Sequence, residues 1–150
     1  METVVKRFNE LTVEELYEIL KLRSKVFVVD QNCIYQDLDD IDKQAYHVYL
    51  KDGENIVAYL RVIDKNKRLD EVSIGRVISL RRRQGLGSKL MKVGLQVAKE
   101  AFGASVVKIG AQCYAKPFYE RAGFRQISEE YLEDGIPHIY MLCTDMHPKS

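Results

Sequence analysis

Apolar residues recur along the chain with two different periods, and these periods predict its elements. Two-residue alternation and short continuous apolar runs predict strands, whereas a period near 3.6 residues predicts helices. The expected strands are residues 3–8, 45–50, 55–63, 72–78, 105–111, 124–128 and 136–144. The expected helices are residues 12–29, 86–102 and 117–121. The order β-α-β-β-β-α-β-α-β-β predicts one mixed α/β domain over residues 1–150.

Local signals support several of these boundaries. Thr12 and Glu15 have the spacing of a capping box, which starts a helix. Gly103 is a candidate C-cap, and Asp52-Gly53 predicts a hairpin turn. Arg23 interrupts the apolar stripe of the first helix. We interpret Arg23 as a surface residue whose aliphatic stem covers apolar neighbours.

Residues 30–43 are expected to form a long loop rich in carboxylates. An EF-hand is excluded, because Asp42 and Val48 occupy the positions that require glycine and glutamate. A solvated loop is the favoured interpretation, and an acidic mouth that attracts a cationic amine is the alternative. The carboxylates are Asp37, Asp39, Asp40 and Asp42.

A glycine-containing loop, Arg82-Arg83-Gln84-Gly85-Leu86-Gly87-Ser88, joins the strand at 72–78 to the helix at 86–102. A helix N-terminus directs unpaired N–H groups at such a loop, and the arginines add positive charge. The pattern therefore predicts a phosphate cradle, with a plain turn and solvated arginines as the alternative. It lacks the third glycine of a dinucleotide site, since Leu90 stands there, and it lacks the P-loop spacing.

Arg82-x-x-Gly85-x-Gly87 resembles the acyl-coenzyme A (acyl-CoA) pyrophosphate loop of the GNAT superfamily of N-acetyltransferases. Phe118-Tyr119-x-x-x-Gly123-Phe124 is also typical of that superfamily. Four segments resemble its ElaA-like branch, namely 22–31, 75–77, 111–112 and 133–138. The resemblance implies a GNAT fold, with a central, mostly antiparallel mixed sheet flanked by helices. In that fold the fourth and fifth strands splay apart and admit the thioester arm of acyl-CoA.

The resemblance also implies which residues bind acetyl-CoA as co-substrate. Main-chain groups of the fourth strand would hold the acyl and pantetheine carbonyls, and the glycine loop would hold the diphosphate. Gln112 stands where many relatives carry an asparagine that contacts CoA. The expected cofactor-binding residues are Val77, Ile78, Ser79, Arg82, Arg83, Gln84, Gly85, Leu86, Gly87, Ser88, Gln112 and Phe118.

Acetyl transfer needs an acid for the leaving thiolate and a base for the attacking ammonium. Tyr119 matches the tyrosine that GNAT enzymes commonly use as the acid, and its alternative role is a core aromatic residue. Glu71 stands six residues before Val77, where some relatives carry a catalytic glutamate, and it is otherwise a solvated charge at a strand start. His47 and His138 titrate in the range of a base, although a structural role is common for each.

The acceptor pocket is expected to include His47, Glu133, Asp134 and His138. The alternative for the last three is an ordinary hairpin turn. Acidic residues here and at 37–42 favour a cationic amine. We therefore expect acetyl transfer from acetyl-CoA to a primary amine by direct attack in a ternary complex. The rival is a non-catalytic acyl-CoA-binding or regulatory domain.

Composition changes this picture little. The 150 residues are 46% apolar and 30% charged, with a net charge of +1, which gives no global argument for nucleic acid or membrane partners. The short Arg81-Arg82-Arg83 run could touch DNA, but the composition argues against a nucleic-acid module. No apolar run approaches 18 residues, and we expect a cytoplasmic protein that is a monomer or a homodimer. Cys33, Cys113 and Cys143 lack metal-ligand or C-x-x-C spacing, which predicts free thiols and no metal site.

Overall fold

The computed structural model describes residues 1–80 and 85–144. Arg82, Arg83 and Gln84, which we predicted to bind the diphosphate, therefore lie outside the described residues.

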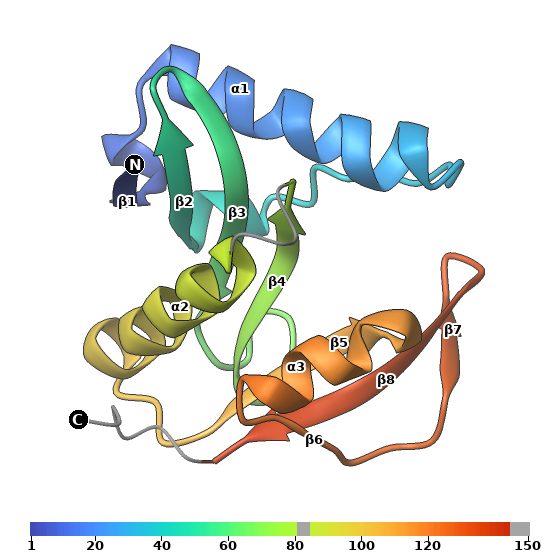
Figure 1. Ribbon diagram of the computed structural model, residues 1–150. Coiled ribbons are helices and arrows are strands. Elements are labelled where there is room, and N and C mark those ends of the chain that lie inside the picture. Colours follow the sequence, from blue (N-terminus) through green and yellow to red (C-terminus); the bar gives the residue numbers. More distant parts are fainter. Residues whose placement is uncertain (81–84, 145–150) are drawn as a thin grey trace.

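One twisted sheet of eight strands forms the centre of the described part of the chain (Figure 1). Its order is β1-β2-β3-β4-β5-β8-β6, with β7 paired to β8, and every pairing except β4–β5 is antiparallel. This arrangement confirms the predicted mixed α/β fold. The strands are β1 Glu2–Arg7, β2 Tyr46–Asp52, β3 Asn55–Ile63, β4 Val72–Ser79, β5 Val107–Gln112, β6 Arg125–Gln126, β7 Tyr131–Glu133 and β8 Ile136–Cys143.

Helices cover both faces of this sheet (Figure 1). On one face, Ile19 of α1 packs with Tyr49, Tyr59 and Ile78. On the other face, helices α2 and α3 pack against the larger apolar cluster, which includes Leu60 of β3. Leu60 follows Tyr59 along β3, and neighbouring residues of a strand point to opposite faces of the sheet. The helices are α1 Val13–Arg23, the π-helix Ser24–Asp30, α2 Leu86–Phe102 and α3 Lys116–Arg121, with 3₁₀ turns at Phe8–Glu10, Ile41–Gln44 and Cys113–Ala115.

Strands β4 and β5 touch only at one end. Their parallel pairing covers Val72 with Val107 and Ser73 with Lys108, after which the two strands diverge. The open side of this V faces the region between the C-terminal end of α1 and the β7–β8 hairpin (Figure 1). The predicted splay of the fourth and fifth strands is thus confirmed.

A β-bulge distorts β4 beside the opening. The register with β3 steps from Ile78–Tyr59 to Gly75–Arg61, so β4 carries one extra residue. Arg76 within this bulge has a φ of 52°, a left-handed conformation that is uncommon for a residue other than glycine. A bulge of this kind bends the strand and redirects its side chains, and here it helps β4 turn away from β5.

Helix α1 begins as predicted but ends earlier, and the last hairpin is tighter than predicted. The capping box of α1 forms, because the amide of Glu15 donates to Thr12 Oγ1 at 3.1 Å and the amide of Thr12 donates to Glu15 Oε1 at 2.9 Å. However, the α-helix ends at Arg23 and continues as a π-helix. Near the C-terminus, Asp134-Gly135 forms a two-residue turn with positive φ at both positions, so β7 and β8 make a tighter hairpin than predicted.

The surface role expected of Arg23 is wrong, and the loop expected at 30–43 is solvated only in part. Arg23 is fully buried, and its guanidinium contacts Asp37 at 3.0 Å and Asp42 at 2.6 Å. Asp42 also pairs with Arg61 at 2.9 Å, and Arg61 pairs with Asp39 at 2.6 Å. Asp37, Asp39 and Asp42 turn inward toward the buried arginines, which need negative partners, whereas Asp40 stays exposed.

Candidate active site

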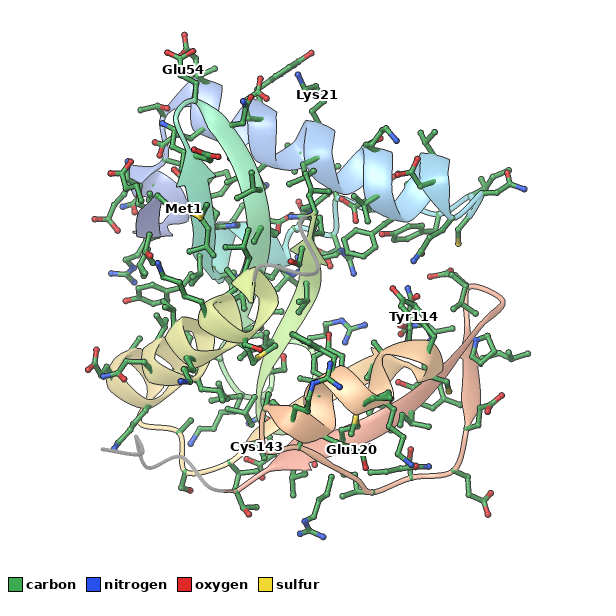
Figure 2. The ribbon with its side chains drawn as sticks, in the orientation of Figure 1. Met1, Lys21, Glu54, Tyr114, Glu120 and Cys143 are labelled. Carbon is green, nitrogen blue, oxygen red and sulfur yellow. The ribbon has the colours of Figure 1, made fainter. Side chains whose placement is uncertain are left out.

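A cavity of about 710 Å³ occupies the opening between β4 and β5. Its walls come from β4, the start of α2, α3, the π-helix and the β7–β8 hairpin. Tyr114 lines this cavity, and in Figure 2 it lies on the side of the C-terminal half that faces the opening. Glu120 and Cys143 lie on the opposite side of that half (Figure 2). The cavity therefore reaches into the molecule between its two halves.

One half of the cavity collects most of the residues predicted to bind the cofactor. We call it the cofactor half, and it contains the end of β4, the start of α2 and the start of α3. The predicted residues that line the cavity are Val77, Ile78, Ser79, Gly85, Gly87, Ser88, Gln112 and Phe118. Leu86 differs, because its side chain packs in the core and is 7% exposed.

The start of α2 opens onto the cofactor half. Gly85 is the N-cap in a left-handed conformation with φ of 68°, and the helix that follows has 17 residues. Such a terminus offers unpaired N–H groups and a positive dipole end to an anion. Gly87 has a different reason to be glycine, since a Cβ there would lie 2.8 Å from Cε1 of Phe118. This close contact holds α3 against the first turn of α2.

Tyr119 both packs in the core and reaches the cavity. Its ring makes edge-to-face contacts with Phe118 and Phe124, at centroid distances of 5.1 and 5.9 Å. The side chain is 9% exposed and lines the cavity. Burial raises the pKa of Tyr119 above its usual value, which makes the phenol a weaker acid than in water and keeps it protonated at neutral pH.

Gln112 does not present a free amide to the cavity. Its carboxamide exchanges two hydrogen bonds with that of Gln31, at 3.0 and 3.2 Å. Gln112 ends β5, whereas Gln31 follows the π-helix on the other side of the opening. The pair therefore bridges the two halves of the molecule, and sequence reasoning missed Gln31 because the partners are 81 residues apart.

The second half of the cavity, which we call the acceptor half, gathers the predicted residues of the β7–β8 hairpin. Glu133, Asp134 and His138 all line the cavity. His138 Nδ1 lies 2.7 Å from the carbonyl oxygen of Ile136, and Nε2 lies 3.5 Å from Glu133 Oε2. Arg68 Nη2 lies 3.2 Å from the other carboxylate oxygen of Glu133.

An ion-pair network forms the back wall of the acceptor half. Arg61, Arg76 and Tyr35 line the cavity, and the guanidinium of Arg76 lies over the Tyr35 ring at 5.5 Å. Tyr35 donates a hydrogen bond to Asp37 at 2.6 Å. Burial alone would raise the pKa of Asp39, but hydrogen bonds and charge from Arg61 outweigh it and lower that pKa to about 2. Asp37 and Asp39 are therefore paired with arginines and do not form the acidic mouth that was the alternative expectation.

A family model described as "Acetyltransferase (GNAT) domain" matches residues 9–144. The chain belongs to this family. A UPF0039 protein of Schizosaccharomyces pombe is 43% identical over 145 residues, covering 94% of this chain and 95% of the relative.

Two solved structures resemble this GNAT domain closely. An acyl-CoA N-acyltransferase from Pseudomonas aeruginosa has a TM-score of 0.87 at 39% identity, covering 95% of this chain and 99% of that one. The Escherichia coli protein ElaA has a TM-score of 0.87 at 38% identity, covering 95% and 98%. These similarities confirm both the GNAT fold and the ElaA-like resemblance.

Two predicted residues of the GNAT site lie away from the cavity. Among the residues that the structure describes, neither Glu71 nor His47 lines it. Glu71 precedes β4 at the closed end of the V, and six strand residues place it about 20 Å from Val77. His47 is fully buried between Tyr59 Oη at 2.8 Å and the Asp42 carbonyl oxygen at 2.9 Å, and burial lowers its pKa.

Residues 1–80 and 85–144 contain neither a membrane-spanning helix nor a cluster of metal ligands. No helix there is long and apolar enough to span a membrane. No three His, Cys, Asp or Glu residues within those ranges come close enough together to hold a metal ion.

Proposed function

We propose that this protein transfers the acetyl group of acetyl-CoA to a primary amine by direct attack in a ternary complex. The observation that carries the proposal is one continuous cavity that is lined both by a helix N-terminus and by a histidine–carboxylate pair. Between these ends, β4 pairs with β5 only at Val72 and Ser73 within the described chain, so its later main-chain groups face the opening. Preorganised N–H donors of this kind stabilise a thioester oxyanion.

Two parts of the cavity fit two parts of an acyl-CoA, its diphosphate and its pantetheine arm. The start of α2 suits the diphosphate. Gly85 adopts a left-handed conformation there, and the space beside its Cα is open, since no atom lies within 4 Å of the position that a Cβ would take. The opening between β4 and β5 suits the pantetheine arm.

The proposed reaction is a direct displacement at the thioester. The amine nitrogen, after its ammonium form has lost one proton, attacks the thioester carbonyl carbon and forms a C–N bond. The C–S bond then breaks, the sulfur takes a proton from the hydroxyl of Tyr119, and the nitrogen releases its second proton to solvent as it becomes the amide N–H. The products are an N-substituted acetamide and CoA, and Tyr119 regains its proton from solvent.

The cysteines support direct attack rather than an acyl-enzyme. Desolvation and the nearby Glu130 carboxylate raise the pKa of Cys113, which opposes formation of a nucleophilic thiolate. Cys33 lines the cavity, but its thiol hydrogen is already engaged with the carbonyl oxygen of Asp134 at 3.5 Å.

The substitution Tyr119→Phe separates the enzyme from its rival, a non-catalytic acyl-CoA-binding domain. We expect kcat to fall about 10²-fold or more, because positioned acids contribute on that order. CoA affinity measured by calorimetry should change by less than about twofold, since the ring and its contacts remain. The acceptor panel should hold polyamines, lysine peptides and aminoglycosides. The proposal fails if wild-type protein binds acetyl-CoA yet acetylates none of them.

A further inference from the structure

The hydrogen bonding of His138 fixes which of its nitrogens carries the proton. A carbonyl oxygen can only accept a hydrogen bond, and Nδ1 lies 2.7 Å from that of Ile136. Nδ1 therefore carries a hydrogen, and Nε2 of the neutral ring is left with a lone pair. This is the tautomer that a base needs, with its free nitrogen directed away from the backbone.

That free nitrogen faces a carboxylate. Nε2 lies 3.5 Å from Glu133 Oε2, and both atoms are hydrogen-bond acceptors while the ring is neutral. Two acceptors cannot form a hydrogen bond with each other, so a group that donates hydrogen bonds to both atoms would complete the pair. An alkylammonium does this, because it donates to both atoms and its charge is matched by the carboxylate.

The surroundings hold this pair in place. His138 is 7% exposed, and its ring stacks on Tyr131 at a centroid distance of 5.8 Å and an interplanar angle of 29°. Arg68 binds the remaining oxygen of Glu133. The ionisable groups facing the imidazole are thus Glu133 and Tyr131 from β7, with Arg68 behind Glu133 from the β3–β4 connection. Both members of the pair line the acceptor half.

Two other carboxylates near the acceptor half, apart from Asp134 in the hairpin turn, already have cationic partners. Asp37 pairs with Arg23 and Arg76, and Asp30 pairs with Lys25 at 2.5 Å. A carboxylate with a bound guanidinium or ammonium is a weak base, because the pairing stabilises its ionised form. Nε2 of the neutral His138 ring, in contrast, keeps a lone pair that can accept a proton.

From this geometry we infer that His138 is the general base of the proposed acetyl transfer and that Glu133 binds the acceptor ammonium beside it. The inference rests on the proposed function. One N–H bond of the ammonium breaks, its proton moves to His138 Nε2, and the nitrogen lone pair attacks the thioester. The imidazolium is stabilised by Glu133 and returns its proton to solvent after the product leaves. The acceptor is accordingly an amine that is cationic in solution.

The first test needs no acceptor. Imidazole NMR of the free protein should show neutral His138 as the Nδ1–H tautomer. In Glu133→Gln, the Nε2 resonance of His138 should shift, because the carboxylate 3.5 Å from that nitrogen has gone. The matched control is Glu129→Gln, an exposed charge before the same hairpin, which should leave that resonance unchanged. An Nε2–H tautomer, or equal shifts in both variants, would overturn the inference.

The second test uses His138→Gln with ethylamine and 2,2,2-trifluoroethylamine as probes. Ethylamine is almost fully protonated at neutral pH, whereas its fluorinated analogue is largely neutral and needs the base less. We expect kcat/KM to fall about 10²-fold or more for ethylamine and at least tenfold less for the analogue. Equal losses for the two amines would refute the role of His138 as base.

Activity measurements distinguish a failure of the inference from a failure of the proposed function. If wild-type protein acetylates amines and His138→Gln does so equally well, only the inference fails. If wild-type protein binds acetyl-CoA and acetylates no amine of the panel, the proposed function fails as well. Calorimetry with CoA on His138→Gln checks that the cofactor half is intact, and its affinity should match that of wild type.

Discussion

Replacing Asp42 by asparagine should destabilise the fold strongly, because this carboxylate joins two buried arginines. Its side chain is 8% exposed and contacts Arg23 at 2.6 Å and Arg61 at 2.9 Å. Asparagine has nearly the same shape but no charge, so the substitution removes the counter-ion while creating little space. Asp40 provides a matched control in the same loop, since its side chain is 89% exposed and lies 3.3 Å from Lys43.

The two substitutions should differ by several kcal/mol. Removing one partner of a buried ion pair costs about 3–5 kcal/mol, because the remaining charge is left uncompensated. Arg61 keeps Asp39 and Arg23 keeps Asp37, so we expect the lower end of that range, about 3 kcal/mol, for Asp42→Asn. Asp40→Asn removes an exposed pair worth roughly 0–1 kcal/mol.

Urea unfolding at pH 7 measures both free energies. Burial would raise the pKa of Asp42, but Arg23 and Arg61 outweigh it and lower that pKa. The stability that Asp42 contributes is therefore present above its unfolded pKa of about 4 and is lost as the pH falls through its folded pKa. The difference between wild type and Asp42→Asn should shrink in acid. A loss below about 1 kcal/mol at pH 7, within the range of a surface pair, would refute this account of the network.

Three further predictions follow from the described contacts. Gly87→Ala should cost roughly 1–3 kcal/mol of packing energy against Phe118, partly offset by about 1 kcal/mol of helix propensity. Its CoA affinity by calorimetry should fall, and Phe118→Leu added to it should restore part of the loss. Single and double alanine variants of Gln31 and Gln112 should show a coupling of about 0.5–1.5 kcal/mol in thermal or urea unfolding, and additive effects would contradict the bridge. Because the pKa of Asp39 is lowered to about 2, its share of stability should be complete above pH 4 and disappear toward pH 2 in an acid-unfolding titration.

The sequence predicted the elements whose signals are local. Helix α2 begins at Leu86 and ends at Phe102 as expected, because its apolar period and its flanking glycines act over neighbouring residues. The glycine loop and the Phe118-Tyr119 motif also contain residues that line the cavity, namely Gly85, Gly87, Ser88, Phe118 and Tyr119. Strand β7 was missed, because three residues between a bend and a turn carry no detectable period.

The acidic loop and Arg23 could not be interpreted from the sequence alone. Whether a carboxylate faces water or a buried guanidinium depends on partners that lie far away in the chain. Arg23 and Asp37 are 14 residues apart, and Arg76 and Asp37 are 39 apart. His47 and His138 looked alike as titratable residues on strands. Only the fold separates them, by burying one inside the ion network and placing the other at the cavity wall.

The divergence of β4 and β5 leaves one continuous sheet joined at its middle by two residue pairs. A long ligand lying in that opening, with main-chain-like amides along its length, takes the place of a missing strand between the two halves. Binding should then tie β5 and β8 to the rest of the sheet. Their amide hydrogens, not only those touching the ligand, should exchange more slowly with solvent deuterium in the complex.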